Sequence, residues 1–282
     1  MRGFFDEAMR RPPEWAQRQM AKLPIDRKLL SQVNQAAIQI AGVHCIEVTP
    51  KNSTSNSTVV YLHGGAYVMG SPASYSAFTA QLAVACGARM VVPDYRLSPA
   101  HRFPAAQEDC LAVTRELLAT GTHEIILMGD SAGGALAANT ALALQPTPSI
   151  KGLVLLSPWV EPTASGGTMI SNDAHDVFSK TFLDQCFAMH IGEADAQDPR
   201  VNLVCAELAG LPKTYVQSGG AELFHDQIAE FAERAKHAGA DLSWDVYPPQ
   251  FHVFQALAAG DPDGVRAIDQ IAEFVIPLGR TE

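Results

Sequence analysis

The sequence predicts an α/β fold, a mostly parallel central sheet with helices on both faces and a helical cap over one edge. From about residue 58 onward, short runs rich in β-branched residues alternate with longer helical stretches, which is typical of strand–helix–strand units. The strand runs are apolar throughout, as expected for strands that are covered on both faces. The 282 residues are 47% hydrophobic and 18% charged, which is ordinary for a globular chain with one sizeable core.

The expected elements follow one another in regular order. Strands are expected at residues 58–62, 89–93, 124–128, 150–156, 213–217 and 242–247, and helices at 76–87, 104–119, 132–144, 227–238 and 265–276.

Two stretches depart from this alternation. Residues 1–40 look mostly helical and amphipathic and precede the first expected strand, and residues 158–210 carry a helix at 180–191 between two strands. Ligands of open α/β sheets bind beyond the carboxyl ends of the strands, so we expect both stretches to lie over that edge as a lid. The apolar residues behind the first expectation are Trp15, Met20, Leu23, Leu29, Leu30 and Val33.

Charge and cysteine content exclude several classes of protein. Twenty Lys and Arg against 30 Asp and Glu give a net charge of −10, which argues against a nucleic-acid partner. The five scattered cysteines predict neither a disulfide framework nor a zinc site. The N-terminus lacks a signal-peptide pattern, and no apolar run reaches 18 residues. We therefore expect a cytoplasmic protein with no membrane partner.

The strongest chemical signal is Gly-Asp-Ser-Ala-Gly at residues 129–133. An apolar strand ends in this motif and a helical run starts directly after it, which is the setting of a nucleophile elbow. The flanking glycines suit a sharp turn that is pressed against other backbone. Ser131 is thus the candidate nucleophile, and a glycine-rich turn with a capping serine is the structural alternative.

A second loop supplies candidates for oxyanion binding. Residues 63–66, His-Gly-Gly-Ala, follow a strand and present residues with little side chain, as bare N–H donors require. Gly65, Ala66 (or Gly64) and Ala132, the residue after the nucleophile, are the expected donors. We expect His63 to hold the loop by side-chain hydrogen bonds.

A base and an acid must follow the serine in chain order. His252 lies just after the last expected strand, where the loops of the carboxyl edge gather, and is the candidate base. The acid should follow the preceding strand, within residues 218–226, where both Glu222 and Asp226 are available.

These motifs, together with Asp-Tyr-Arg-Leu-Ser-Pro-Ala-His-Arg-Phe-Pro-Ala-Ala at residues 94–106, resemble the hormone-sensitive-lipase-like (bacterial family IV) carboxylesterases of the α/β-hydrolase fold. The resemblance covers residues 55 to 275. It implies a catalytic triad of Ser131, His252 and a carboxylate, with no metal or organic cofactor. The family's acid is usually an Asp followed four residues later by a second Asp, a spacing that puts Glu222 at the catalytic position and Asp226 at the secondary one.

The resemblance also implies a division of the chain. Residues 1–40 and 158–210 would form the two parts of the cap, and residues 41–157 and 211–282 the two parts of the catalytic domain. Ala66 stands where the family commonly has a third glycine, and its methyl group could crowd the substrate. Asp94 and Arg96 are expected to hold the fold rather than to act in catalysis. The resemblance also suggests a homodimer.

The expected activity is hydrolysis of short- to medium-chain esters of small molecules through an acyl-enzyme. A lactone hydrolase or amidase would use the same triad. The resemblance also implies a relation to non-catalytic small-molecule receptors of the same fold, in which the catalytic histidine is lost, whereas His252 is present here. Aromatic residues and a methionine in the expected cap either line an apolar pocket or pack the cap against the sheet: Trp159, Phe178, Phe182, Phe187 and Met189.

Overall fold

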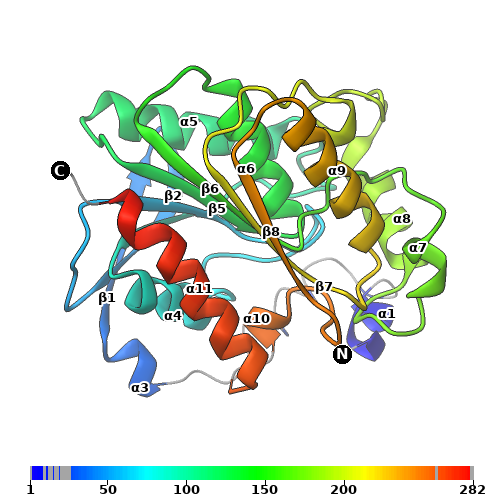
Figure 1. The fold of residues 1–282 in the computed structure, drawn as a ribbon, viewed down its shortest axis with the longest axis horizontal. Helices are drawn as coiled ribbons and strands as arrows, with labels where there is room; N and C mark the ends of the chain where they lie inside the picture. Colours follow the sequence, from blue (N-terminus) through cyan, green and yellow to red (C-terminus); the bar gives the residue numbers. More distant parts are fainter. Residues whose placement is uncertain are drawn as a thin grey trace.

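The computed structural model describes residues 2–8, 11, 15, 19, 27–257 and 260–279. Its centre is an eight-stranded sheet in the order β1-β2-β4-β3-β5-β6-β7-β8 (Figure 1). Strand β2 pairs antiparallel with β1 and β4, and all the other pairs are parallel. The strands are β1 Val33–Ile40, β2 Val43–Pro50, β3 Thr58–Leu62, β4 Arg89–Pro93, β5 Ile125–Asp130, β6 Ile150–Leu156, β7 Thr214–Gly219 and β8 Leu242–Tyr247.

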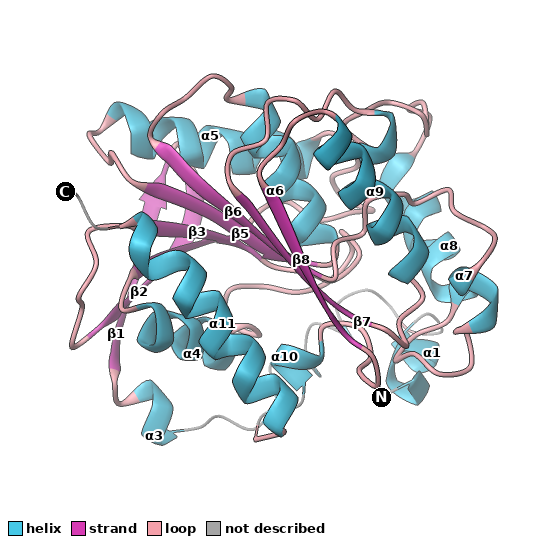
Figure 2. Ribbon diagram, viewed as in Figure 1, coloured by secondary structure: helices cyan, strands magenta, loops and turns pink. Residues whose placement is uncertain are grey.

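Helices cover both faces of the sheet (Figure 2). One face carries α5 Ala105–Ala119, α6 Ala132–Ala143 and α9 His225–His237, and the other carries α4 Ser76–Cys86 and α11 Pro262–Leu278. Side chains alternate between the two cores along β3, because successive residues of a strand point to opposite faces. Val60 and Leu62 pack with α5 and α6, whereas Val59 and Tyr61 pack with α4 and α11.

The remaining helices of the described residues are short or lie outside these two layers. They are α1 Arg2–Ala8, α3 Arg27–Leu30, α7 Thr168–Ser171, α8 Lys180–Ile191 and α10 Phe254–Leu257, with a 3₁₀ turn at Leu203–Cys205. In the described part of the chain, no helix has the length and hydrophobicity that a bilayer crossing requires.

Helices α7 and α8 of the 158–210 stretch lie at one end of the molecule, together with α1 (Figure 1). The ring of Phe5 in α1 contacts Phe178 and Phe182, with centroid distances of 5.9 and 5.2 Å. The N-terminal helix therefore packs on the inserted segment even though more than 150 residues separate them in sequence.

The expectation that residues 1–40 are mostly helical is wrong for 33–40. This segment is the edge strand β1, which joins β2 through Ala41 and Gly42, both at positive φ (50° and 81°). Such a two-residue turn favours Asn-Gly, so Ala41 gave little signal of a hairpin. Strand β1 is also largely exposed and lacks a continuous apolar run. Of the residues used for the helical expectation, Met20 and Leu23 lie outside the described part of the chain.

Candidate active site

Ser131 occupies the turn between β5 and α6. Its backbone has φ 54° and ψ −123°, a combination that costs free energy for any residue with a side chain. A Cβ atom at Gly133 would overlap the carbonyl oxygen of Leu62, and one at Gly129 would overlap the carbonyl of Gly133. The two glycines thus allow the turn to sit directly against β3, as a nucleophile elbow requires.

The backbone of Ser131 is tied to the end of the neighbouring strand β6. Its N–H donates to the carbonyl oxygen of Leu156 at 2.9 Å, and its carbonyl oxygen accepts from the N–H of Trp159 at 3.0 Å. These two bonds hold the strained turn in place. Burial is nearly complete, since only 6% of Ser131 is exposed.

The loop after β3 lies beside this turn. The Gly64 N–H donates to Asp130 Oδ1 at 2.9 Å, and the same carboxylate accepts from the hydroxyls of Tyr61 and Tyr75 at 2.6 and 2.8 Å. Burial raises the pKa of Asp130 to about 6. Gly64, offered by the sequence as an alternative oxyanion donor, therefore has its N–H engaged elsewhere.

The two residues after Gly64 have the geometry of free donors. Gly65 and Ala66 both have positive φ, 117° and 52°, so the loop turns sharply there. Within residues 27–257, neither N–H makes a hydrogen bond. Of the predicted oxyanion donors, the N–H groups of Gly65, Ala66 and Ala132, the last at the start of α6, therefore remain as candidates.

His63 anchors this loop. Its Nδ1 lies 2.7 Å from the carbonyl oxygen of Gly64, which assigns the ring proton to Nδ1, and its ring stacks on Tyr95 at 4.3 Å. The Tyr95 hydroxyl in turn donates to the backbone carbonyl of His63 at 2.5 Å. These contacts fit the expectation that His63 holds the loop in place by side-chain hydrogen bonds.

Glu222 and His252 lie close together beyond the ends of β7 and β8. Glu222 Oε2 is 3.8 Å from His252 Nδ1, and both side chains are buried. Glu222 Oε2 also accepts from the Ser157 hydroxyl at 2.6 Å and from the N–H of Gly219 at 3.3 Å. In the described residues, Glu222 Oε1 and His252 Nδ1 have no hydrogen-bond partner.

Burial shifts the pKa values of both groups. It lowers the pKa of His252 to about 3, so the imidazole is neutral near pH 7 and able to accept a proton. Burial, with a further contribution from the nearby Asp176, raises the pKa of Glu222 above its ordinary value. The His252 ring lies between Phe178 and Phe224, edge-to-face with each, at 4.6 and 4.9 Å.

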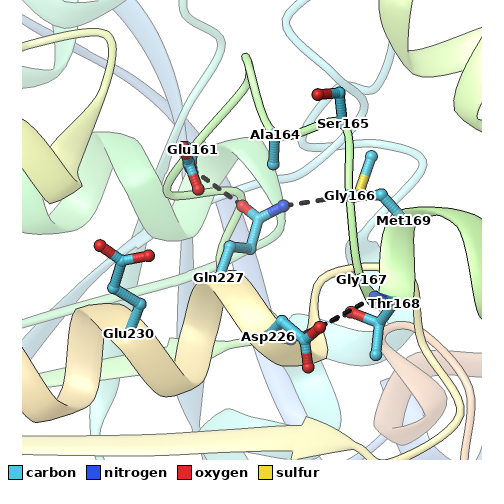
Figure 3. A pocket seen from close by; sticks show the side chains of 10 residues that line it. All are labelled: Glu161, Ala164, Ser165, Gly166, Gly167, Thr168, Met169, Asp226, Gln227 and Glu230. Atoms are coloured by element: carbon cyan, nitrogen blue, oxygen red, sulfur yellow. Dashed lines mark hydrogen bonds between the residues drawn. The ribbon is translucent and has the colours of Figure 1, made fainter.

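Asp226, the other predicted acid, lies elsewhere. Its side chain is exposed at the start of α9, and its Oδ2 accepts from the N–H of Thr168 at 2.9 Å. Asp226 lines a hollow of about 230 Å³ together with Glu161 and Glu230, whose side chains are drawn in Figure 3. Its hydrogen bonds connect α9 to α7 rather than to His252, which leaves Glu222 as the acid candidate.

Ser131 and the loop that carries His252 are both hydrogen-bonded to residues at the end of β6. The Ser157 hydroxyl accepts from the N–H of Val253 at 3.2 Å and donates to Glu222, while Leu156 holds Ser131. Over the described residues, no hydrogen bond joins Ser131 to the His252 ring, and such catalytic bonds are often long before substrate binds. Sequence reasoning missed Ser157, although its place directly after the β6 run could have indicated it.

Comparison with known proteins decides the family. A family model of the alpha/beta hydrolase fold matches residues 59–256. The chain belongs to the α/β-hydrolase family. The crystal structure of an esterase from the bacterial hormone-sensitive lipase family superposes on this hydrolase with a TM-score of 0.90 and 32% identity, over 99% of this chain and 96% of that one.

Relatives in sequence point the same way. An acetyl-hydrolase of Streptomyces hygroscopicus is 33% identical over 223 residues, which are 77% of this hydrolase and 75% of the relative. An esterase of Acinetobacter venetianus is 32% identical over 247 residues, 86% and 81% of the two chains. The predicted fold class and the predicted membership in the hormone-sensitive-lipase type of esterases are confirmed.

Proposed function

We propose that this α/β-hydrolase is a serine carboxylesterase that cleaves short- to medium-chain esters with Ser131, His252 and Glu222 as its triad. The observation that carries the proposal is the backbone of Ser131, held at φ 54° between β5 and α6. A non-glycine residue is kept in so costly a conformation where the strain serves function. The esterase and acetyl-hydrolase relatives support the ester class and the short acyl group.

The proposed reaction uses these groups in order. His252 Nε2 takes the proton of Ser131 Oγ, which attacks the ester carbonyl carbon. The oxyanion accepts from the N–H groups of Gly65, Ala66 and Ala132, each worth about 3 kcal/mol of barrier lowering. His252 then protonates the leaving alcohol, and water repeats the sequence on the acyl-enzyme to release the acid. Glu222 orients His252 and stabilises the imidazolium that forms.

The cap is proposed to be built from both predicted parts, with the first part shortened by strand β1. Helices α1 and α8 support this division through the contact of Phe5 with Phe182.

We also propose a cytoplasmic location, which the five unpaired cysteines fit, and a homodimer, as the resemblance suggests.

The test is hydrolysis of p-nitrophenyl esters from acetate to palmitate. We expect the wild type to prefer the short chains, and Ser131→Ala to lose more than about 10³-fold in kcat on all of them. Ser165→Ala, which changes an exposed serine of the 158–210 stretch, is the matched control and should keep full activity. Equal activity of Ser131→Ala and wild type would disprove the proposal. Turnover of a lactone or a p-nitroanilide in place of esters would reassign the substrate class.

A further inference from the structure

Asp176 is a buried carboxylate that the proposed triad does not use. It lies between α7 and α8 in the 158–210 stretch, and only 5% of it is exposed. Asp176 Oδ1 accepts from the backbone N–H of His252 at 3.0 Å and from that of Val177 at 2.8 Å. Asp176 Oδ2 accepts from the backbone N–H of Leu223 at 2.8 Å. One side chain of the cap segment thus bonds the residue that follows Glu222 and the residue proposed as the base.

We propose that Asp176 is a positioning residue: the cap carboxylate fixes the two separate loops that carry Glu222 and His252, so the cap holds the triad in its working geometry. The proposal rests on the function proposed above. It follows from topology, because Leu223 and His252 are 47 and 76 residues away from Asp176 in sequence and come from loops after different strands.

The chemistry favours a carboxylate at this place over other acceptors. An ionised carboxylate accepts through both oxygens and donates nothing, so it can serve three N–H groups at once. An asparagine offers one oxygen, and its amide group would face one of the donors. The negative charge of Asp176 also comes close enough to Glu222 to raise the pKa of that carboxyl, an electrostatic cost that a purely packing residue would not impose.

Neighbouring cap residues contact the same two loops. Asn172 Nδ2 donates to the carbonyl oxygen of Glu222 at 3.0 Å. Phe178 lies edge-on to the ring of His252 at 4.6 Å. Asn172 and Phe178 therefore contact the backbone of the acid and the ring of the base, with Asp176 between them in the sequence.

The test compares Asp176→Asn with Asp173→Asn in the full-length protein. Asp173 lies in the same cap segment and also accepts a backbone N–H, that of Lys180 at 2.7 Å. Reaction with diethyl p-nitrophenyl phosphate, run to completion, counts the reactive Ser131 sites in each preparation. Thermal unfolding shows whether each variant is folded, and kcat and KM for p-nitrophenyl acetate are then expressed per reactive site.

We expect kcat per reactive site to fall by about 10- to 100-fold in Asp176→Asn, with KM changed by less than about twofold, because a misplaced base slows chemistry more than binding. Asp173→Asn should leave both constants within about twofold of wild type.

A lower melting temperature with unchanged kcat per site would overturn the proposal and leave Asp176 with a structural role only. If Asp176→Asn does not fold, Asp176→Glu takes its place, since it keeps the charge but displaces both oxygens, and an unchanged kcat there would also overturn the proposal. Activity of wild type but not of Ser131→Ala secures the hydrolase independently of this result.

Discussion

At the scale of single residues, the choice of acid depends on which carboxylate reaches His252. Glu222 is completely buried with an oxygen 3.8 Å from His252 Nδ1, whereas Asp226 is exposed and bonded to Thr168. Glutamate has one methylene more than the usual aspartate. Glu222 accepts from the Ser157 hydroxyl and approaches the imidazole with the same oxygen, Oε2.

Glu222→Gln should therefore lower kcat for p-nitrophenyl acetate by about 10²- to 10⁴-fold, because an amide stabilises the imidazolium poorly and can select the wrong tautomer. Asp226→Asn is the control and should stay within about twofold of wild type. Steady-state kinetics of the two variants decide the assignment. A larger loss in Asp226→Asn than in Glu222→Gln would show that the acid has been misidentified.

The pH profile should reflect the burial of His252. An ordinary histidine has a pKa near 6.5, but burial lowers that of His252 to about 3, so its basic form persists into acid. We expect kcat/KM for p-nitrophenyl acetate to be kept at pH 6 and to reach half its plateau only below about pH 5. A midpoint at 6.5 or above would contradict the buried, neutral imidazole.

The lowered pKa of His252 also makes the folded state less stable at acid pH. The unfolded chain takes up a proton on this histidine near pH 6.5, and the folded chain does so only near pH 3. The contribution of His252 to folding stability is therefore complete above pH 6.5 and is lost as the pH falls from 6.5 towards 3. Rates at low pH must therefore be expressed per reactive site, counted with the organophosphate.

At the scale of elements, the strand–turn–helix unit around Ser131 depends on how closely α6 approaches β3. Gly133 is the contact point, because its Cα faces the carbonyl oxygens of Leu62 and His63. The same backbone carries the oxyanion loop onward from β3. Any displacement of α6 would thus move the nucleophile and the proposed donors apart.

Gly133→Ala should lower stability by about 3 kcal/mol or more, since the added methyl group overlaps backbone atoms that cannot rotate away. Gly166→Ala is the matched control, because a Cβ there meets nothing within 4 Å, and it should change stability by less than about 0.5 kcal/mol. Urea unfolding followed by circular dichroism measures both. Equal stability of the two variants would mean that α6 can shift without penalty.

At the scale of the whole molecule, the parallel core could be predicted almost to the residue. The strands at Thr58–Leu62, Arg89–Pro93, Ile150–Leu156 and Leu242–Tyr247 begin and end where expected, because β-branched apolar runs are bounded by polar or turn residues. Strands β1 and β2 were missed. Strand β1 is exposed at the edge of the sheet and has little apolar signal, and polar residues interrupt the apolar residues of β2. The turn between them, Ala41 and Gly42, is an uncommon pair.

The candidate site was predictable where its motifs are local in sequence or where the order of strands places a residue at the sheet edge. The glycines that a sharp turn needs indicate both Ser131 and the loop after His63 in the sequence. The order of strands also indicated His252 and a carboxylate near residue 222. Asp176 gave no such signal, because its partners lie 47 and 76 residues away and only the folded cap brings them to it.

The packing of α1 has a practical consequence for fusion proteins. Phe5 contacts Phe178, and Phe178 contacts the His252 ring, so a tag placed ahead of α1 would begin two aromatic contacts away from the proposed base. Helix α11 instead ends, at Leu278, on the opposite side of the molecule from α8 (Figure 1). Affinity handles, fluorophores or surface tethers are therefore better attached behind α11, where they leave the cap undisturbed.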